Sequence, residues 1–460
     1  MQDQLMADTE ALTLSATDLV EAVRSRKLTP REVTVASLAQ IERLNPKVGA
    51  FEHVRREEAL AEAEALESRS DMGDLPLAGV PIAIKDNVPV AGEPSRSGSR
   101  ATSPDPQPRD HELVRRLREA GAVVVGITRM PELGVWGMTD NAFGTARNPW
   151  KLDRTTGGSS GGAAAAVASA MVPVAHGTDG LGSIRIPSAC CGVVGIKPGF
   201  GTVPAGIGKT SWFGWSENGV LATTVEDAAL VLSVMARDPE LRDLSGIRGV
   251  LRIGVSTQSP LLGVNVAPEI RTTVEDAAQL FSAAGHEVVT AKIPYSTRNF
   301  VGGFWWYAAA VAKESEDFEV GKLEPRTRRH AALGRTAQRL GLIKPNALQR
   351  WRRDAKQLFL EIDLLVTPVL LKTPPRANGW HRRGWAVSMA TQVGYAPFAA
   401  WWNLVGYPAA SVPAGLHSTG VPIGVQLVGR PGSEALILAA AKLLEERRPW
   451  QRHAPLAEAD

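Results

Sequence analysis

The sequence predicts an α/β fold built as one large domain, and two observations support this prediction. Short runs of β-branched residues bounded by Gly and Pro alternate with helical patterns along the chain. No Pro-, Ser- or Gly-rich linker and no break in composition separates them. Single cores rarely exceed about 250–300 residues, so one domain of 460 residues is unusually long. With 44% hydrophobic and 22% charged residues, the chain can supply such a core.

The elements follow in order from the N-terminal end. We expect a helical segment over about residues 8–70, because Ser15 and Asp18 form a capping-box pattern and a Thr-Pro pair at residues 29–30 is typical of a second helix start. Strands are expected at residues 80–88, 121–128, 172–180, 251–257, 286–293, 363–369, 411–416 and 423–430. Helices between these strands are expected at residues 111–120, 274–284 and 434–447, among others.

Charge and cysteine content exclude several classes of protein. The 51 basic and 48 acidic side chains leave a formal charge of +3 without charge blocks, which is not typical of a nucleic-acid-binding protein. Cys190 and Cys191 are adjacent, so they cannot link distant parts of the chain. Because no spaced His/Cys cluster is present either, we expect no metal site and no nucleic-acid partner.

The N-terminal residues and the hydropathy favour a cytoplasmic protein. Residues 1–30 carry acidic side chains throughout and lack the basic start and apolar stretch of a signal peptide. The chain also lacks a run of about 18 apolar residues that would predict a transmembrane helix. We therefore expect neither a leader nor a membrane association.

The stretch TTGGSSGGAAAAVASAM at residues 155–171 joins a polar Gly/Ser loop to an Ala-rich helix. Residues 157–161 satisfy the G-x-S-x-G pattern of an α/β-hydrolase elbow, but that elbow follows an apolar strand, and residues 148–156 are polar. In a second interpretation the glycines and serines only form turns that pack a helix against the sheet. That interpretation stays open on these residues alone.

A second loop ends in Gly208-Lys209-Thr210, like a Walker A phosphate loop. The pattern requires a first Gly at the position that Val203 occupies. The sequence therefore does not predict a phosphate-binding loop here.

Lys85 lies at the end of the apolar run VPIAI, where a strand is expected to enter the sheet. An isolated buried ammonium group is costly, so such a lysine must be paired, must extend to solvent, or must be neutral with a depressed pKa. On its own, this position favours the paired or extended arrangement.

Four segments together resemble the amidase signature family: GVPIAIKDN (79–87), GITRMPELGVWGMTDNAFGTARNPW (126–150), GGSSGG (157–162) and GTDGLGSIRIPSACCGVVGIKPG (177–199). A tail at residues 397–431 is similar to the closing segment of that family, and the resemblance runs from about residue 12 to about 450. It implies one domain over residues 1–460 with a mixed, twisted central sheet covered by helices on both faces. It also implies a signature core over about 75–235 and a variable, pocket-forming region over about 236–455.

The resemblance implies a Ser-Ser-Lys catalytic triad without a cofactor. By position, Ser183 is the nucleophile, Ser159 is the bridging serine after a cis Gly158–Ser159 bond, and Lys85 is the base. Elementary chemistry agrees, because a neutral lysine in a water-poor site can activate a serine through a second hydroxyl. We expect a rate optimum at neutral to alkaline pH, since Lys85 must lose its proton.

The expected oxyanion hole consists of the backbone N–H groups of Gly180, Leu181, Gly182 and Ser183. Here the chain departs from the family, whose usual pattern is Thr-Gly-Gly-Ser. Because Leu181 tolerates a positive φ poorly, we expect the loop to bend at Gly180 or Gly182, and the Leu181 side chain to approach the pocket.

Nearby residues have supporting interpretations. We expect Ser160 to join the network of Lys85 and Ser159, Asp179 to brace the loop, and Arg185 to pair internally. His176 suggests a Ser-His arrangement, but a single histidine in this context is more often a hydrogen-bonded core residue. Cys190 and Cys191 are expected to pack as small buried side chains.

The leading functional prediction is hydrolysis of small-molecule carboxamides, with esters and carbamates also compatible with the chemistry. One alternative is the glutamine-hydrolysing A subunit of a tRNA-dependent amidotransferase, which belongs to the same family, and another is a catalytically inactive binding protein. The sequence leaves open whether the protein is a homodimer.

Tryptophan is over-represented, with 12 Trp against 4 Tyr. Most of these tryptophans lie in the segments where the family varies its pocket, and they favour a bulky apolar or aryl substrate. The predicted pocket residues are Trp212, Trp215, Trp305, Trp306, Trp401 and Trp402.

Overall fold

The computed structural model describes residues 13–245 and 247–458 of the chain, so the predicted helical residues before 13 lie outside the described part. Its centre is one mixed sheet of 11 strands, which contains every strand predicted above. In spatial order the strands are β1 (Phe51–Val54), β3 (Val123–Thr128), β2 (Pro81–Lys85), β8 (Val174–Asp179), β10 (Glu217–Ala222), β9 (Val194–Lys197), β14 (Ala409–Leu416), β15 (Pro422–Gly429), β13 (Leu364–Pro368), β11 (Arg252–Val255) and β12 (Glu287–Thr290).

Parallel and antiparallel pairs occur side by side in the sheet. β2 runs parallel to both β3 and β8, and β11 runs parallel to β12 and β13. The central strands from β8 through β10, β9, β14 and β15 to β13 pair antiparallel. Because β2 and β8 run in the same direction, their carboxyl ends lie at the same edge of the sheet.

Helices cover both faces of the sheet, as its alternating side chains require. Ile82 and Ile84 of β2 belong to one buried cluster and Ala83 to another, so successive side chains of this strand serve opposite faces. The layer on the Ile82 face consists of α2 (Ala16–Arg24), α5 (Glu112–Glu119), α9 (Val225–Ala236), α10 (Pro268–Ala283) and α16 (Glu434–Arg447). The layer on the Ala83 face consists of α3 (Pro30–Val48), α4 (Arg56–Glu67), α6 (Gly161–Ala168) and α7 (Arg185–Cys191).

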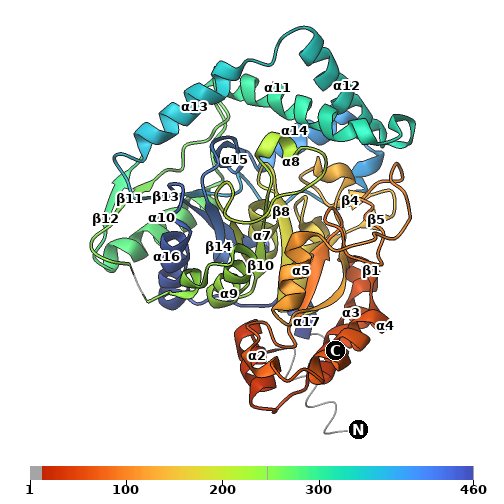
Figure 1. Cartoon of the computed structure of the whole chain (residues 1–460). Helices are drawn as coiled ribbons and strands as arrows, with labels where there is room; N and C mark the ends of the chain where they lie inside the picture. The colour runs from red at the N-terminus through yellow and green to blue at the C-terminus, as the bar shows by residue number, and fades with distance from the viewer. Residues whose placement is uncertain (1–12, 246, 459–460) are drawn as a thin grey trace.

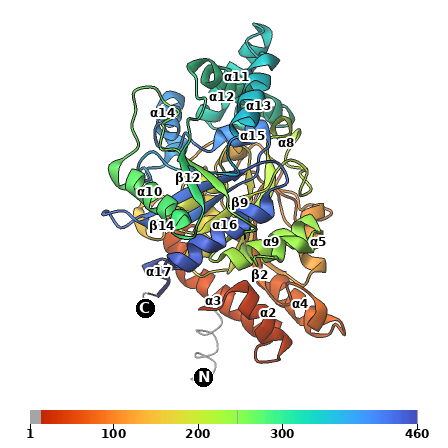
Figure 2. The same ribbon diagram turned by 90° about the vertical axis from the view of Figure 1, so that its left-hand side faces the viewer.

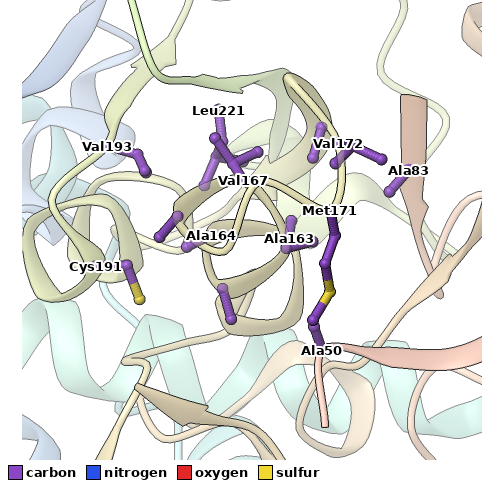
Figure 3. Packing of buried hydrophobic residues seen from close by; sticks show 14 of the residues in the cluster. Ala50, Ala83, Ala163, Ala164, Val167, Met171, Val172, Cys191, Val193 and Leu221 are labelled. Atoms are coloured by element: carbon purple, nitrogen blue, oxygen red, sulfur yellow. The ribbon is translucent and has the colours of Figure 1, made fainter. Parts of the chain in front are cut away.

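The Ala-rich α6 is buried on all sides. Ala163, Ala164 and Val167 pack among Ala83, Leu221 and Cys191, side chains from both the sheet and α7 (Figure 3). Small side chains let the helix lie close to the sheet. This packing fixes the Gly/Ser loop at the N-terminal end of α6.

The remaining helices form a cap at one end of the molecule, opposite α2 and α3 (Figure 1), and the rotated view shows α11, α12 and α13 at that end as well (Figure 2). The cap contains α8 (Ser211–Gly214), α11 (Thr297–Glu314), α12 (Pro325–Arg339), α13 (Pro345–Leu358), α14 (Trp385–Tyr395) and α15 (Ala400–Val405). Helix α17 (Pro455–Glu458) lies outside these layers. Two small hairpins also lie outside them: β4 (Asp140–Asn141) pairs with β5 (Gly144–Thr145), and β6 (Arg147–Asn148) pairs with β7 (Lys151–Thr155). Short 3-10 turns occur at Met72–Asp74, Glu132–Gly134, Pro239–Arg242, Ser315–Asp317, Val320–Lys322 and Trp380–Arg382.

Local signals in the sequence mark several boundaries correctly. The capping box of Ser15 and Asp18 is present, and Thr29 caps α3, which begins at Pro30. The sequence did not predict β1, β9 or β10. Within the described ranges, none of the helices is both long enough and apolar enough to cross a membrane.

Candidate active site

Lys85 ends β2 and is completely buried at the edge of the sheet. Its Nζ atom lies 2.8 Å from Ser159 Oγ, 2.8 Å from Ser160 Oγ and 2.8 Å from Thr178 Oγ1. It also lies 3.2 Å from the Thr178 carbonyl oxygen. The hydrogen-bond partners of this amine are therefore neutral oxygens.

This environment favours the neutral amine. Burial lowers the pKa of Lys85 from its usual 10.5 to about 7, against the opposing field of Asp179. A substantial share of the lysine is therefore unprotonated near neutral pH, as a general base requires.

Ser159 follows a cis Gly158–Ser159 peptide bond, as predicted. Ser160 precedes α6 and is held from two sides: its hydroxyl donates to Thr178 O (3.1 Å) and accepts from Thr178 N–H (3.2 Å). Ser160 thus joins the network of Lys85 and Ser159, with its own proton directed at Thr178 O. The sequence analysis missed Thr178, although it directly precedes the predicted Asp179.

Ser183 lies in the loop from β8 to α7 and is only partly buried. Within the described residues its hydroxyl has no hydrogen-bond partner. The loop bends at Gly182, where φ is +111°, which confirms one of the two expected positions. Ser159, Leu181 and Ser183 all line the same cavity.

Asp179 and Arg185 brace this loop from beneath, as predicted. Asp179 accepts hydrogen bonds from Gly182 N–H (2.6 Å), Ile184 N–H (3.1 Å) and Arg185 Nε (2.9 Å). Burial acts to raise the pKa of Asp179, but the Arg185 guanidinium, together with Lys197 and a hydrogen bond from Asn403, holds that pKa well below the usual range. Asn403 of α15, which the sequence analysis did not identify, donates to Asp179 O (2.7 Å) and accepts from Arg185 (2.6 Å).

This network shows that one of the four expected oxyanion donors was predicted wrongly. The Gly182 N–H points at the Asp179 carboxylate, so it is not free to bind a developing oxyanion. In the described part of the chain, the N–H groups of Gly180, Leu181 and Ser183 have no such partner. They remain available as donors.

The cavity above Ser183 has a volume of about 160 Å³. An apolar cavity of about 150 Å³ accommodates benzene, so this space suits a group of ring size. None of the described lining residues has a charged side chain. The lining consists of Asn87, Leu133, Gly134, Val135, Trp136, Gly137, Gly158, Ser159, Thr178, Gly180, Leu181, Ser183, Ile186, Trp212, Ser216, Phe300, Gly303, Phe304, Tyr307, Met389, Gln392, Val393, Ala396, Pro397, Ala400, Trp401 and Leu404.

Three segments of the cap contribute lining residues. These residues are spaced i, i+3, i+4 and i+7, which is the spacing of one side of a helix, although Ala396 follows the end of α14 and Pro397 precedes α15. They are Phe300, Gly303, Phe304 and Tyr307 from α11; Met389, Gln392, Val393 and Ala396 at α14; and Pro397, Ala400, Trp401 and Leu404 at α15.

This geometry corrects the tryptophan prediction. Trp212 and Trp401 line the cavity, and so does Trp136, which was not predicted. The other four predicted tryptophans lie outside the lining: Trp305 and Trp306 are off the cavity face of α11, Trp402 is buried beside Trp401, and Trp215 packs against Trp306. Adjacent residues on a helix point about 100° apart, and here only Trp401 of its pair, and neither Trp305 nor Trp306, lies on the cavity face.

Trp212 sits in a left-handed turn. Ser211, Trp212 and Phe213 have φ values of +49°, +55° and +56°. Left-handed backbone costs about 1–2 kcal/mol per non-glycine residue, so surrounding contacts must hold this turn.

His176 is a core residue, as predicted. It is fully buried, accepts from Lys85 N–H at Nδ1 (3.4 Å), and its Nε2 lies 2.8 Å from Asn218 Oδ1. Burial lowers the pKa of His176 to about 3, so the ring is neutral at ordinary pH. Cys190 and Cys191 are likewise buried and unlinked.

Comparisons with known proteins show which proteins the chain is similar to. A family model described as Amidase matches residues 32–438. The chain is 39% identical to the Mycobacterium tuberculosis protein AmiB2, which is named as an amidase, over 91% of this chain and 92% of that protein. It resembles the structure of a 6-aminohexanoate cyclic dimer hydrolase with a TM-score of 0.86 and 30% identity, over 97% of this chain and 99% of that one. A bacterial aryl acylamidase structure matches with a TM-score of 0.83 and 29% identity, over 97% and 99% of the two chains.

Proposed function

The chain belongs to the amidase signature family and acts on amides, and from that premise we propose that it cleaves the C–N bond through an acyl-enzyme on Ser183. The observation that carries the proposal is the buried Lys85 amine, which lies 2.8 Å from Ser159 Oγ beside a cavity that Ser183 also lines.

The proton path follows from the hydroxyl partners. A neutral lysine offers one lone pair, and Ser160 already directs its proton at Thr178 O (3.1 Å). Ser159 is therefore the serine whose proton Lys85 Nζ accepts. Once Ser159 has lost that proton, its oxygen can take the proton of Ser183.

The reaction then balances in two halves. Ser183 Oγ bonds to the amide carbon, and its proton passes through Ser159 to Lys85; the C–N bond breaks as the proton returns to the departing amine. Water next attacks the ester, loses a proton along the same path, and releases a carboxylic acid and free Ser183. The N–H groups of Gly180, Leu181 and Ser183 stabilise the oxyanion in both halves.

The cavity supports a bulky, uncharged substrate with an apolar or aryl group. Trp136, Trp212, Phe304 and Tyr307 supply flat walls, and the described lining is free of charged side chains. Esters and carbamates pass through the same type of tetrahedral intermediate and are proposed as further substrates. Free glutamine would bring an ammonium and a carboxylate group into this uncharged lining, which argues against the amidotransferase subunit.

A panel of anilides tests this proposal, with release of the aryl amine as the signal. We expect turnover by the wild type and loss of turnover in Ser183→Ala and Lys85→Ala. Ser103→Ala, at an exposed loop serine that pairs with Asp105, serves as the matched control and should leave the rate unchanged. Turnover retained in Lys85→Ala but lost in His176→Gln would contradict the Ser-Ser-Lys path.

A further inference from the structure

The loop that ends like a Walker A motif encloses a carboxylate of its own chain. Glu314, at the end of α11, is buried, and its Oε2 accepts from Lys209 N–H (2.7 Å). Its Oε1 accepts from Thr210 N–H (2.9 Å), Thr210 Oγ1 (2.5 Å) and Trp212 N–H (3.1 Å). Successive backbone N–H groups that converge on one anion form a nest, and here Glu314 occupies it.

Gly208 leaves the room that this carboxylate needs. Its φ is +60°, and a Cβ atom built there would lie 2.3 Å from Glu314 Oε2. A side chain at Gly208 would therefore displace the carboxylate from the nest.

The same loop places Trp212 beside the proposed oxyanion donors. A Cβ atom built at Gly180 would lie 3.7 Å from Trp212 Cδ2, so the indole ring is within van der Waals distance of that position. The ring also stacks on Tyr307, with ring centroids 5.9 Å apart and an interplanar angle of 20°. Both aromatic residues line the cavity.

We propose that Glu314 is a positioning residue that sets substrate preference: its carboxylate holds the left-handed turn at Ser211–Phe213, and the turn fixes Trp212 as the cavity wall next to Gly180. Local strain of this kind persists only where surrounding contacts impose it, and the Glu314 carboxylate supplies four such contacts to the turn and its approach. This proposal rests on the proposed amide hydrolysis at Ser183.

The kinetic test compares the p-nitroanilides of benzoic and acetic acid. In Glu314→Gln we expect kcat/KM for the benzoyl substrate to fall about 10- to 100-fold, the cost of a small misplacement, mainly through KM, while the acetyl substrate changes less. Gly208→Ala should do the same, because it displaces the same carboxylate. Glu316→Gln is the matched control, because Glu316 is exposed and contacts only the Lys209 side chain of this loop (3.3 Å). In this variant the ratio of kcat/KM for the benzoyl substrate to kcat/KM for the acetyl substrate should stay at the wild-type value.

A double-mutant cycle shows whether Glu314 acts through Trp212. Trp212→Ala should lower the same ratio, and adding Glu314→Gln to it should have little further effect, because the group being positioned is already gone. An additive double variant, or a wild-type ratio in both Glu314→Gln and Gly208→Ala, would overturn the proposal.

A measurement without turnover separates this proposal from the proposed function. The quenching of Trp212 by acrylamide is taken as the difference between each protein and its Trp212→Phe partner. We expect stronger quenching of Trp212 in Glu314→Gln and Gly208→Ala than in the wild type and Glu316→Gln. Equal quenching of Trp212 in all four proteins would contradict the positioning role of Glu314, even if the wild type hydrolyses anilides. A wild type that hydrolyses no anilide would contradict the proposed function, whatever the quenching shows.

Discussion

Lys85 Nζ lies 2.8 Å from Ser159 Oγ, and both residues are at most 2% exposed. The amine lies at the end of a strand with both faces covered, where water cannot solvate an ammonium ion. This relationship makes Lys85 a candidate base, and the pH dependence of both rate and stability follows from it.

The rate should follow the ionisation of Lys85. Because burial lowers the pKa of Lys85 to about 7, we expect kcat/KM to rise with pH through that value and then level off. Asp86 is a second group whose pKa burial raises to about 7. A pH profile of Asp86→Asn therefore serves as the control and should keep the wild-type inflection, whereas a rate maximum near pH 5 in the wild type would contradict the role of Lys85.

The same ionisation should appear in stability. The folded state releases the Lys85 proton at about pH 7, while the unfolded state keeps it up to about 10.5, so the unfolded state binds more protons between these values. The free energy of unfolding should then rise by about 1.4 kcal/mol per pH unit in this window relative to Lys85→Met. Urea unfolding of both proteins at pH 7, 8 and 9 measures this difference, and parallel stability curves would contradict a neutral lysine.

The ion pair of Asp179 and Arg185 should be important for stability. Both side chains are fully buried, so Asp179→Asn leaves an unpaired guanidinium in the core and should cost about 3–5 kcal/mol of unfolding free energy. Asp153→Asn removes a carboxylate that is 50% exposed and pairs loosely with Arg154 at 3.6 Å, so it should cost at most about 1 kcal/mol. Denaturant unfolding compares the two, and similar losses would argue against the bracing role of Asp179.

Adjacent residues of α11 should differ in their effect on substrates. Phe304 lines the cavity and Trp305 does not. Phe304→Ala should change the ratio of kcat/KM for benzoyl and acetyl anilides by about tenfold, whereas Trp305→Ala should leave that ratio unchanged. Steady-state kinetics with a matched substrate series checks this, and a larger effect at Trp305 would show that the cavity face of α11 is assigned incorrectly.

Most of the sheet could be predicted from the sequence, and the triad could be proposed from it, because both leave local signals. The strand runs are bounded by Gly and Pro, and Lys85, Ser159 and Ser183 lie in the segments that resemble the family. The sequence analysis missed β10 because ENGVLA starts with Glu217, Asn218 and Gly219, which are poor strand formers.

The bracing and the pocket walls depend on contacts between distant parts of the chain. Asn403 reaches Asp179 across 224 residues, and no local pattern indicates that α15 packs there. The spacing of Phe300, Gly303, Phe304 and Tyr307 was readable in the sequence, but which face of α11 meets the cavity depends on how the cap docks. Composition therefore indicated an aromatic pocket, while the choice of individual tryptophans needed the structure.

The most direct test of the account is to trap the acyl-enzyme. The wild type is mixed with an activated aryl ester or anilide, quenched in acid within the first turnover, digested with trypsin and analysed by tandem mass spectrometry. Residues 155–185 form one tryptic peptide that contains both Ser159 and Ser183, so fragmentation must locate the added acyl mass. We predict the acyl group on Ser183 and its absence in Ser183→Ala; an acyl group on Ser159, or steady turnover by Ser183→Ala, would contradict the account.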